Sequence, residues 1–287
     1  MRRRAFLVSA SLAVIDGQRR SDNMFGNAQA YERFMGRWSR QLAPLVIDFA
    51  ALLDNGRVLD IGSGTGALSF EVATRLTGVH VTGIDPSAEY VAYAGSRNPF
   101  PGRVTFRTGD AQHMEFGDST FAAAISLLVF NFIPDAGKAL LEARRVTKPK
   151  GRVVAAVWDY GGRMGMLRQF WDAAIEIDPG AAKFDEKNMP LCRSGELSQL
   201  WKNRGFEHVR EEPIETEIRF GSFADYWEPF LLGQGPAGAY VRKLDQIRLQ
   251  ALRTALRRRV VPSPGEESFV LPARVWAVRG DVPGSGG

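Results

Sequence analysis

The chain has few of the residues that build covalent or metal-centred sites. It holds one cysteine, Cys192, so no intramolecular disulfide can form, and Cys-rich zinc sites and CxxC redox pairs are excluded. The three histidines, His80, His113 and His208, are far apart in the sequence and form no HExxH or HxxxH pattern. We therefore expect no dedicated metal site, although carboxylate sites for Mg²⁺ stay open.

A long apolar run and a strong excess of one charge are also missing. The apolar run that follows the first arginines is too short to span a bilayer, so we expect no stable membrane insertion. The 287 residues carry 37 Lys and Arg against 32 Asp and Glu. Five of the arginines but only two of the acids lie in residues 1–23, so the basic balance belongs partly to that segment. The charge therefore disfavours a nucleic-acid partner.

Residues 1–23 imitate a secretory signal peptide, with a basic start and an apolar run. No small-residue cleavage site follows the run, and Met24 begins a sequence that is typical of a cytosolic start. We expect residues 1–23 to be a leader or a disordered extension, and the protein to be cytoplasmic.

From residue 24 to residue 280 the pattern predicts one α/β domain. Helical spacing over 29–53 predicts two helices that Gly36 and Pro44 divide. Strands and helices then alternate, which indicates a doubly wound, mostly parallel sheet with helices on both faces. The expected strands are 57–61, 79–84, 104–107, 121–126 and 153–158, and the expected helices are 67–76, 88–96 and 136–146.

The second half of the chain is less regular. We expect helices at 164–177 and 194–203, the latter with Ser194 as its N-cap and Gly205 as its stop signal. An extended segment at 207–220, a mostly helical insertion at 221–262 and a last strand at 269–278 follow, and the Gly/Pro-rich end, 281–287, reads as a disordered tail.

A glycine-rich turn, Gly62-Ser63-Gly64-Thr65-Gly66, connects the first strand to its helix. Glycines let the backbone approach a ligand closely, and a helix N-terminus favours an anion, either a diphosphate or a carboxylate. The spacing from Gly62 to Ala67 also fits the dinucleotide fingerprint GxGxxG/A. The loop alone leaves both kinds of ligand open.

Acids at the ends of three successive strands favour a ligand with a carboxylate over a ligand with a diphosphate. Asp60 lies beneath the loop, where a negative charge disfavours a diphosphate and suits an ammonium group. Asp85 ends the second strand, where a carboxylate can accept hydrogen bonds from both ribose hydroxyls. Asp110 follows the third strand, where an adenine amino group can be bound. The three acids describe an amino-acid–nucleoside ligand without phosphates.

These segments resemble the class I S-adenosylmethionine-dependent methyltransferases, and more narrowly the group similar to ubiquinone/menaquinone C-methylases. The resemblance implies a seven-stranded sheet whose last two strands, here 207–220 and 269–278, form an antiparallel hairpin. It also implies S-adenosyl-L-methionine as the cofactor. The matching stretches, within about residues 56–160, are 58–66, 83–87, 109–111, 121–135 and 142–151.

The resemblance carries cofactor-binding roles to individual residues. The methionine end would be held by Asp60, Gly62, Gly64 and Gly66, the ribose by Asp85, the adenine by Asp110 and Ala111, and the methyl side by Ser126 and Leu127. Ala122 and Lys150 depart from the family pattern at positions that we expect to lie away from the ligand. The fourth-strand loop, Asn131–Pro134, lacks an NPPY-type sequence, which further disfavours nucleic-acid and protein-glutamine substrates.

The segment before the sheet adds two candidates. In related methyltransferases an N-terminal helix folds over the cofactor, which would bring Tyr31 to it and let Arg37 pair with the methionine carboxylate. Arg37 could equally be a solvated residue of a packing helix. The aromatic helix and glycine hinge within 223–236 could be a substrate lid or a packing element.

Other reactive side chains give weaker signals. His113 could be a general base, but a surface-loop position is favoured. Asp159 could orient a nucleophile or cap a turn, and Cys192 is expected to be inert because no histidine lies near it in the sequence. The arginines of 242–259 are expected to form a solvated helix face rather than an RNA-binding one.

The sequence therefore predicts an enzyme that transfers a methyl group from S-adenosylmethionine to a small-molecule acceptor by in-line displacement. Such a donor is already activated, so the protein supplies mainly proximity and exclusion of water. No catalytic residue and no oligomeric state is assigned. The alternatives are a non-catalytic module that binds S-adenosylmethionine, an NAD-dependent oxidoreductase, for which we find no catalytic Tyr-x-x-x-Lys pair, and an RNA methylase that uses the basic helix.

Overall fold

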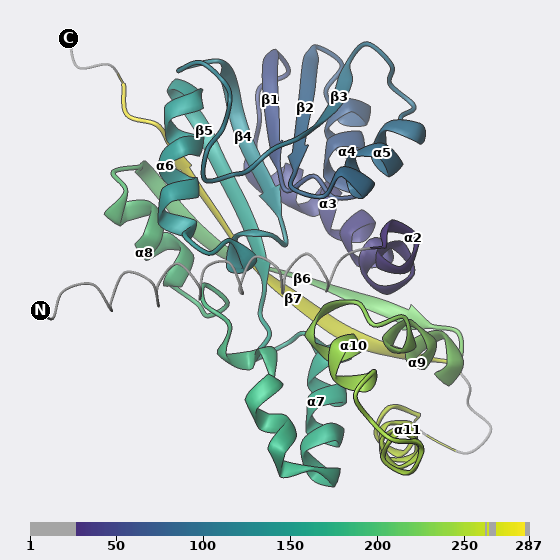
Figure 1. Ribbon diagram of the computed structural model, residues 1–287. Coiled ribbons are helices and arrows are strands. Elements are labelled where there is room, and N and C mark those ends of the chain that lie inside the picture. Colours follow the sequence, from purple (N-terminus) through teal and green to yellow (C-terminus); the bar gives the residue numbers. More distant parts are fainter. Residues whose placement is uncertain (1–26, 262, 264–267, 285–287) are drawn as a thin grey trace, which may run out of the picture.

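A seven-stranded sheet forms the centre of the computed structural model, which describes residues 27–261, 263 and 268–284 (Figure 1). The expected leader, 1–23, lies outside the described residues, as do residues 285–287 of the expected tail. The strands are β1 (Gly56–Ile61), β2 (Val79–Asp85), β3 (Val104–Thr108), β4 (Phe121–Leu127), β5 (Thr147–Trp158), β6 (Glu207–Phe220) and β7 (Phe269–Asp281).

The strand order is β3-β2-β1-β4-β5-β7-β6. Strands β1 to β5 pair in parallel, whereas β7 runs antiparallel to both β5 and β6. The predicted Rossmann-like sheet and its antiparallel C-terminal hairpin are thus confirmed. The order reverses between β1 and β4, and in open α/β sheets ligands bind at such a switch point, outside the carboxyl ends of the strands.

Two groups of helices cover the sheet because its central strands bury apolar side chains on both faces. Helix α3 packs on α4, and α5 packs on β2 and β3. Helix α6 packs on β5, and α8 packs on β6 and β7. The helices are α3 (Arg37–Ala50), α4 (Ala67–Arg75), α5 (Ala88–Ser96), α6 (Ala136–Val146) and α8 (Glu196–Asn203).

A further helical group packs against the far part of the long β6–β7 hairpin (Figure 1). Its helices are apolar toward one another: the rings of Phe170 and Phe230 stack at 4.6 Å, and the buried hydroxyl of Tyr226 donates to the carbonyl of Met166 at 2.9 Å. The members are α7 (Gly165–Ile177), α9 (Phe223–Leu231), α10 (Gly235–Val241) and α11 (Gln246–Val260).

The prediction that Pro44 ends a helix is wrong. Helix α2 (Ala28–Tyr31), a π-helical segment (Glu32–Gly36) and α3 follow one another without a break, and Pro44 lies inside α3. A proline removes one hydrogen bond to the preceding turn. The apolar face of α3, which includes the fully buried Trp38 and Leu42, compensates for this loss because it packs against the sheet.

Two predicted boundaries also differ. Ser194 is not the N-cap of α8: Gly195 takes that position with φ 86°, and the Glu211 carboxylate on β6 accepts hydrogen bonds from the Gly195 and Ser198 N–H groups. Strand β7 reaches Asp281, and the Val282 N–H donates to the Gly151 carbonyl at 2.8 Å, so the start of the expected tail belongs to the sheet. Among the described residues, every helix is too short or too polar to cross a membrane.

Candidate functional site

A cavity of about 680 Å³ lies at the carboxyl ends of β1 to β5, at the switch point of the sheet. Its other walls are Tyr31, Phe34 and Met35 from the N-terminal helical segment and Gly235 and Pro236 from the start of α10. Ligand-binding cavities in proteins commonly have such a volume. The N-terminal helical segment therefore borders the site, and so does one end of 223–236, the candidate for a lid or a packing element.

The glycine loop forms one wall of this cavity through Gly62 and Gly64. The N–H groups of Gly62 and Ser63 donate to the Ile84 carbonyl at 2.8 and 2.9 Å, and the Gly64 N–H donates to Asp85 Oδ2 at 2.9 Å. Gly62 has φ +70°, and a Cβ there would lie 2.5 Å from Val129. The Gly66 N–H donates to the Ser63 carbonyl at 2.9 Å. The loop is thus fixed by the end of β2, and four of its N–H groups are already used within the protein.

Two of the predicted acids meet in the cavity. Asp85 is buried, accepts hydrogen bonds from the Gly64 and Ser87 N–H groups, and has a raised pKa because burial disfavours its charged form. Asp110 is more exposed, and its Oδ1 accepts the Gln112 N–H at 2.8 Å. Of the predicted site residues, the cavity lining includes Tyr31, Gly62, Gly64, Asp85, Asp110 and Ala111.

Asp60 lies behind the glycine loop and does not line the cavity. Its Oδ2 accepts a hydrogen bond from the Ser69 hydroxyl at 2.6 Å, while its buried Oδ1 has no partner among the described residues. Burial raises the pKa of this carboxyl to about 7. Gly66 also lies outside the lining, where its φ of +93° begins α4.

Three more predicted residues are placed elsewhere. The Ser126 hydroxyl donates to the Ile61 carbonyl inside the sheet, and Leu127 is buried beside it, so Leu128 and Val129 line the cavity in their place. Arg37 forms a bidentate ion pair with Asp225 of α9, with a 3.0 Å contact from Nη1 to Oδ2. Its guanidinium therefore connects the N-terminal segment to the insertion and does not line the cavity.

The weaker candidates take structural positions. His113 is on the surface, with 70% of its side chain exposed, 3.6 Å from Asp110. Asp159 is buried, pairs with Arg274 at 2.7 Å and caps the following turn. Cys192 is buried outside the cavity, and burial raises its pKa, which keeps the thiol protonated.

Sequence reasoning missed several side chains of the cavity. The Tyr90 hydroxyl is buried without a partner among the described residues, and burial raises its pKa. Tyr31, whose ring lies 5.3 Å from that of Tyr90, has a pKa raised to about 12 by burial. Trp158 and Glu186 also line the cavity. Of these side chains, only that of Tyr90 could have been expected at the cavity from the sequence, because Tyr90 lies on the first turn of the helix that follows Asp85.

The charge of the lining has one sign. Three carboxyl side chains, those of Asp85, Asp110 and Glu186, border the cavity, and no Lys, Arg or His of the described chain does. The described residues also contain no cluster of His, Cys, Asp and Glu that could hold a metal ion. The cavity therefore suits a ligand that is neutral or positively charged, and not a diphosphate.

The chain resembles known proteins mainly in the part that carries the glycine loop. Residues 59–155 match a family model described as a methyltransferase domain. A ubiquinone/menaquinone biosynthesis C-methyltransferase of Geotalea daltonii is 34% identical over 35% of this chain and 44% of its own length. A demethylmenaquinone methyltransferase of Renibacterium salmoninarum is 33% identical over 43% of this chain and 48% of its own. The chain thus spans less than half of these two relatives.

Solved structures share the fold over a larger part of the chain. Phosphoethanolamine N-methyltransferase 2 of Haemonchus contortus, in complex with S-adenosylhomocysteine, has a TM-score of 0.57 and 18% identity, and the match covers 94% of this chain and 60% of that one. The [4+2]-cyclase SpnF has a TM-score of 0.54 and 18% identity, with 86% of this chain and 81% of that chain covered. At these identities the likeness is one of fold alone.

Proposed function

We propose that this chain binds S-adenosylmethionine in its cavity and transfers the methyl group to a small molecule. The chain belongs to the class I S-adenosylmethionine-dependent methyltransferases that are similar to the ubiquinone/menaquinone C-methylases. The observation that carries the proposal is one cavity in which Asp85, Asp110 and the glycine loop lie together without any basic side chain of the described residues. S-Adenosylmethionine has a sulfonium and an ammonium group against one carboxylate, so its net charge is positive. The lining is complementary to that charge.

The cofactor roles of individual residues belong to the proposal. Asp85 would accept hydrogen bonds from the ribose hydroxyls, since each of its oxygens has a free lone pair besides the one used by a backbone N–H. Asp110 and Ala111 would contact the adenine, and the Tyr90 hydroxyl would find its missing partner on the ligand. Asp60 would act from behind the loop through its unpartnered oxygen, near the ammonium group.

Two other functions remain to be separated from this one. A nicotinamide-dependent oxidoreductase would have to bind a negatively charged diphosphate in an acidic cavity, next to a loop whose N–H groups are partly used. A protein of this fold could also bind the cofactor without transferring its methyl group, and then only turnover tells the two apart. A cytoplasmic location and a single domain over residues 24–280 remain predictions.

The test is isothermal titration calorimetry of the purified full chain with S-adenosylhomocysteine, and with NADH as the matched competitor. We expect saturable binding of S-adenosylhomocysteine and none of NADH. Transfer of radiolabel from methyl-labelled S-adenosylmethionine to a panel of quinols, phenols and amines then separates an enzyme from a binding module. Binding of NADH in place of S-adenosylhomocysteine would reject the proposal.

A further inference from the structure

The end of the cavity that faces away from Asp85 and Asp110 contains one acid that the proposed cofactor contacts leave unused. In the sheet order β2-β1-β4-β5, the end of β5 is three strands from Asp85, or roughly 14 Å at about 4.8 Å per strand. Trp158 and Tyr160, at and just after the end of β5, line the cavity together with Glu186. A ligand that extends from Asp85 across the switch point would turn its other end toward these side chains.

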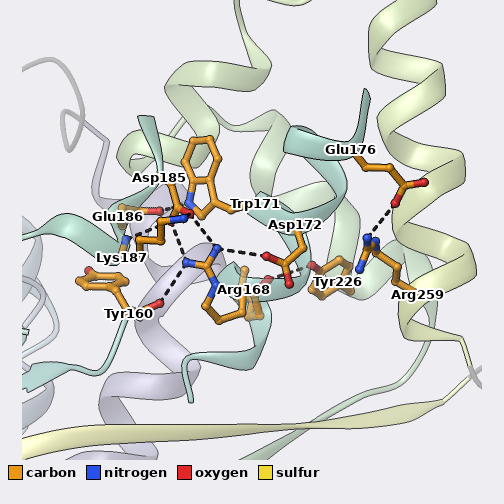
Figure 2. Close-up of polar contacts among 11 residues, drawn as sticks. Tyr160, Arg168, Trp171, Asp172, Glu176, Asp185, Glu186, Lys187, Tyr226 and Arg259 are labelled. Atoms are coloured by element: carbon orange, nitrogen blue, oxygen red, sulfur yellow. Dashed lines mark hydrogen bonds and ion pairs between the residues drawn. The ribbon is translucent and has the colours of Figure 1, made fainter. Parts of the chain in front are cut away.

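Glu186 is held in place by helix α7. The Trp171 indole N–H donates to Glu186 Oε2, and three residues earlier on the same helix Arg168 binds Asp185 with contacts of 2.7 and 2.9 Å (Figure 2). Arg168 also donates to the Tyr160 carbonyl at 3.2 Å, which ties the loop after β5 to the turn that carries Glu186. The Trp171 hydrogen bond therefore fixes the Glu186 carboxyl itself, and the Arg168 contacts fix the turn that carries it.

One oxygen of this buried carboxyl is left for the cavity. Glu186 is 5% exposed, and no described residue donates a hydrogen bond to its Oε1. The nearby cation, Arg168, is used by Asp185, and no Lys, Arg or His of the described residues forms an ion pair with Glu186. Burying an unpaired carboxyl is costly, and a glutamine would accept the Trp171 bond equally well without that cost. The position of an acid here indicates a role toward a ligand.

We infer, building on the proposed function, that the far end of the cavity takes a primary or secondary amine and that Glu186 is the catalytic residue that receives its proton. The amine nitrogen attacks the methyl carbon, the C–N bond forms, and the C–S bond breaks with its electron pair going to sulfur. The N–H proton then passes to Glu186 Oε1. The sulfonium and the carboxylate are both neutralised, and the methylated amine leaves without a net change in its own charge.

The charge and the apolar walls of the cavity favour an amine over other acceptors. An acceptor with a carboxylate or phosphate would find no basic side chain among the described residues that line the cavity. Phe34 and Trp158 line the cavity, and aromatic rings there favour the positive charge that develops on nitrogen during transfer. Burial raises the pKa of Glu186 to about 8, so the ionised carboxylate is basic enough to take the N–H proton from the ammonium group that forms when a weakly basic amine such as aniline is methylated.

The groups around Glu186 do not titrate in its place. Asp185 is ion-paired with Arg168 and Lys187, and its pKa is lowered. The pKa values of Tyr160 and Cys192 are raised by burial, so both stay protonated. Asp60 and Asp85, at the other end of the site, also have raised pKa values, so a rate that rises with pH through about 8 reports on Glu186 when Glu186→Gln removes the rise.

The experiment uses the full chain with benzylamine, benzyl alcohol and benzoate as matched probes. Titrated into the complex with S-adenosylhomocysteine, benzylamine is expected to bind, benzyl alcohol about tenfold more weakly, and benzoate not at all. Aniline, which stays neutral over the relevant pH range, serves as the acceptor for the pH–rate profile with methyl-labelled S-adenosylmethionine. The wild-type rate is expected to rise with pH through the pKa of Glu186.

Glu186→Gln keeps the acceptor for the Trp171 N–H but cannot take a proton. We expect it to lower kcat about 100-fold, to remove the rise with pH, and to leave the affinity for S-adenosylhomocysteine and the Tm at neutral pH close to wild type. The matched control is Glu176→Gln, which replaces an exposed acid on α7 that pairs with Arg259. It should change neither kcat nor the rise of the rate with pH.

The outcomes separate the two proposals. If S-adenosylhomocysteine does not bind, the proposed function fails and the inference fails with it. If it binds but neither amine binds or is methylated, or if Glu186→Gln transfers methyl groups at the wild-type rate and with the wild-type pH profile, the inference alone is overturned.

Discussion

The two ends of the cavity are built in different ways. The end near β1 to β3 consists of strand tips and the turns that follow them, so Gly62, Gly64 and Asp85 come from 24 consecutive residues, 62–85. The other end joins the N-terminal segment, the loop after β5, the turn at Glu186 and the start of α10. The first end, where we propose that the cofactor binds, is encoded by a local motif. The second end depends on tertiary packing, so in this fold it can change while the first end stays the same.

The largest effect is expected for Asp85→Ala. Its carboxylate fixes Gly64 and Ser87 and is proposed to accept two ribose hydroxyls, and charged hydrogen bonds contribute about 1.5–3 kcal/mol each. Calorimetry should show S-adenosylhomocysteine binding weakened about 1000-fold. Asp118→Ala removes an exposed acid and should bind like wild type. Unchanged affinity in Asp85→Ala would remove the cofactor from this end of the cavity.

Two glycines of the loop should respond differently to the same substitution. Gly62→Ala combines an unfavourable φ with a contact to Val129, and we expect a loss of about 3 kcal/mol in the free energy of unfolding. At Gly64, also at positive φ, an added Cβ would have no atom of the described residues within 4 Å, and Gly64 lines the cavity. The loss should therefore be about 1–2 kcal/mol while ligand binding still falls. Urea unfolding and calorimetry measure the two effects, and equal destabilisation would contradict the close approach of Val129.

A pH-dependent effect is expected for Asp60→Asn. The folded pKa of Asp60, about 7, lies above its ordinary value of 3.8, so the folded state holds the proton more tightly and wild-type stability falls as the pH rises between these values. Asparagine cannot ionise. The Tm of the variant relative to wild type should therefore increase by a few degrees from about pH 4 to about pH 7, as read by calorimetric scans. A constant difference would show that Asp60 titrates normally.

The smallest effect is expected at the contact between the N-terminal segment and the insertion. The Arg37–Asp225 pair is about one-third exposed on both sides, so each alanine substitution should cost about 0.5–1 kcal/mol of stability. Arg37→Ala and Asp225→Ala should weaken S-adenosylhomocysteine binding slightly and to the same extent. A large loss of binding in Arg37→Ala alone would instead support the sequence-based pairing of Arg37 with the methionine carboxylate.

The sequence predicted well what depends on neighbouring residues. Helices 88–96 and 136–146 and the strand 207–220 have the predicted bounds, because caps at Ser87 and Asp135 and a clear periodicity define them locally. The predicted residues Ser126 and Leu127 lie one or two positions before Leu128 and Val129, which line the cavity. The position at which β4 ends depends on the neighbouring strands, so the sequence does not define it locally. Pro44 was misread because burial of α3 outweighs a local preference.

Glu186 could not be found from the sequence. Its neighbours in the sequence, Asp185 and Lys187, are also charged, and no periodic pattern marks Glu186 as buried. Contacts from α7 place this turn at the cavity, and they join residues 15 and 17 positions apart. Likewise, the pairing of Arg37 with Asp225 spans 188 positions, beyond the reach of any local signal.

Native mass spectrometry of the purified chain tests the central claim most directly, because the protein itself selects the ligand from the cell. The claim predicts a bound species with the mass of S-adenosylmethionine or S-adenosylhomocysteine, or its appearance when S-adenosylhomocysteine is added, and its absence in Asp85→Ala. A co-purified nicotinamide dinucleotide, or no complex even with added S-adenosylhomocysteine, would contradict it.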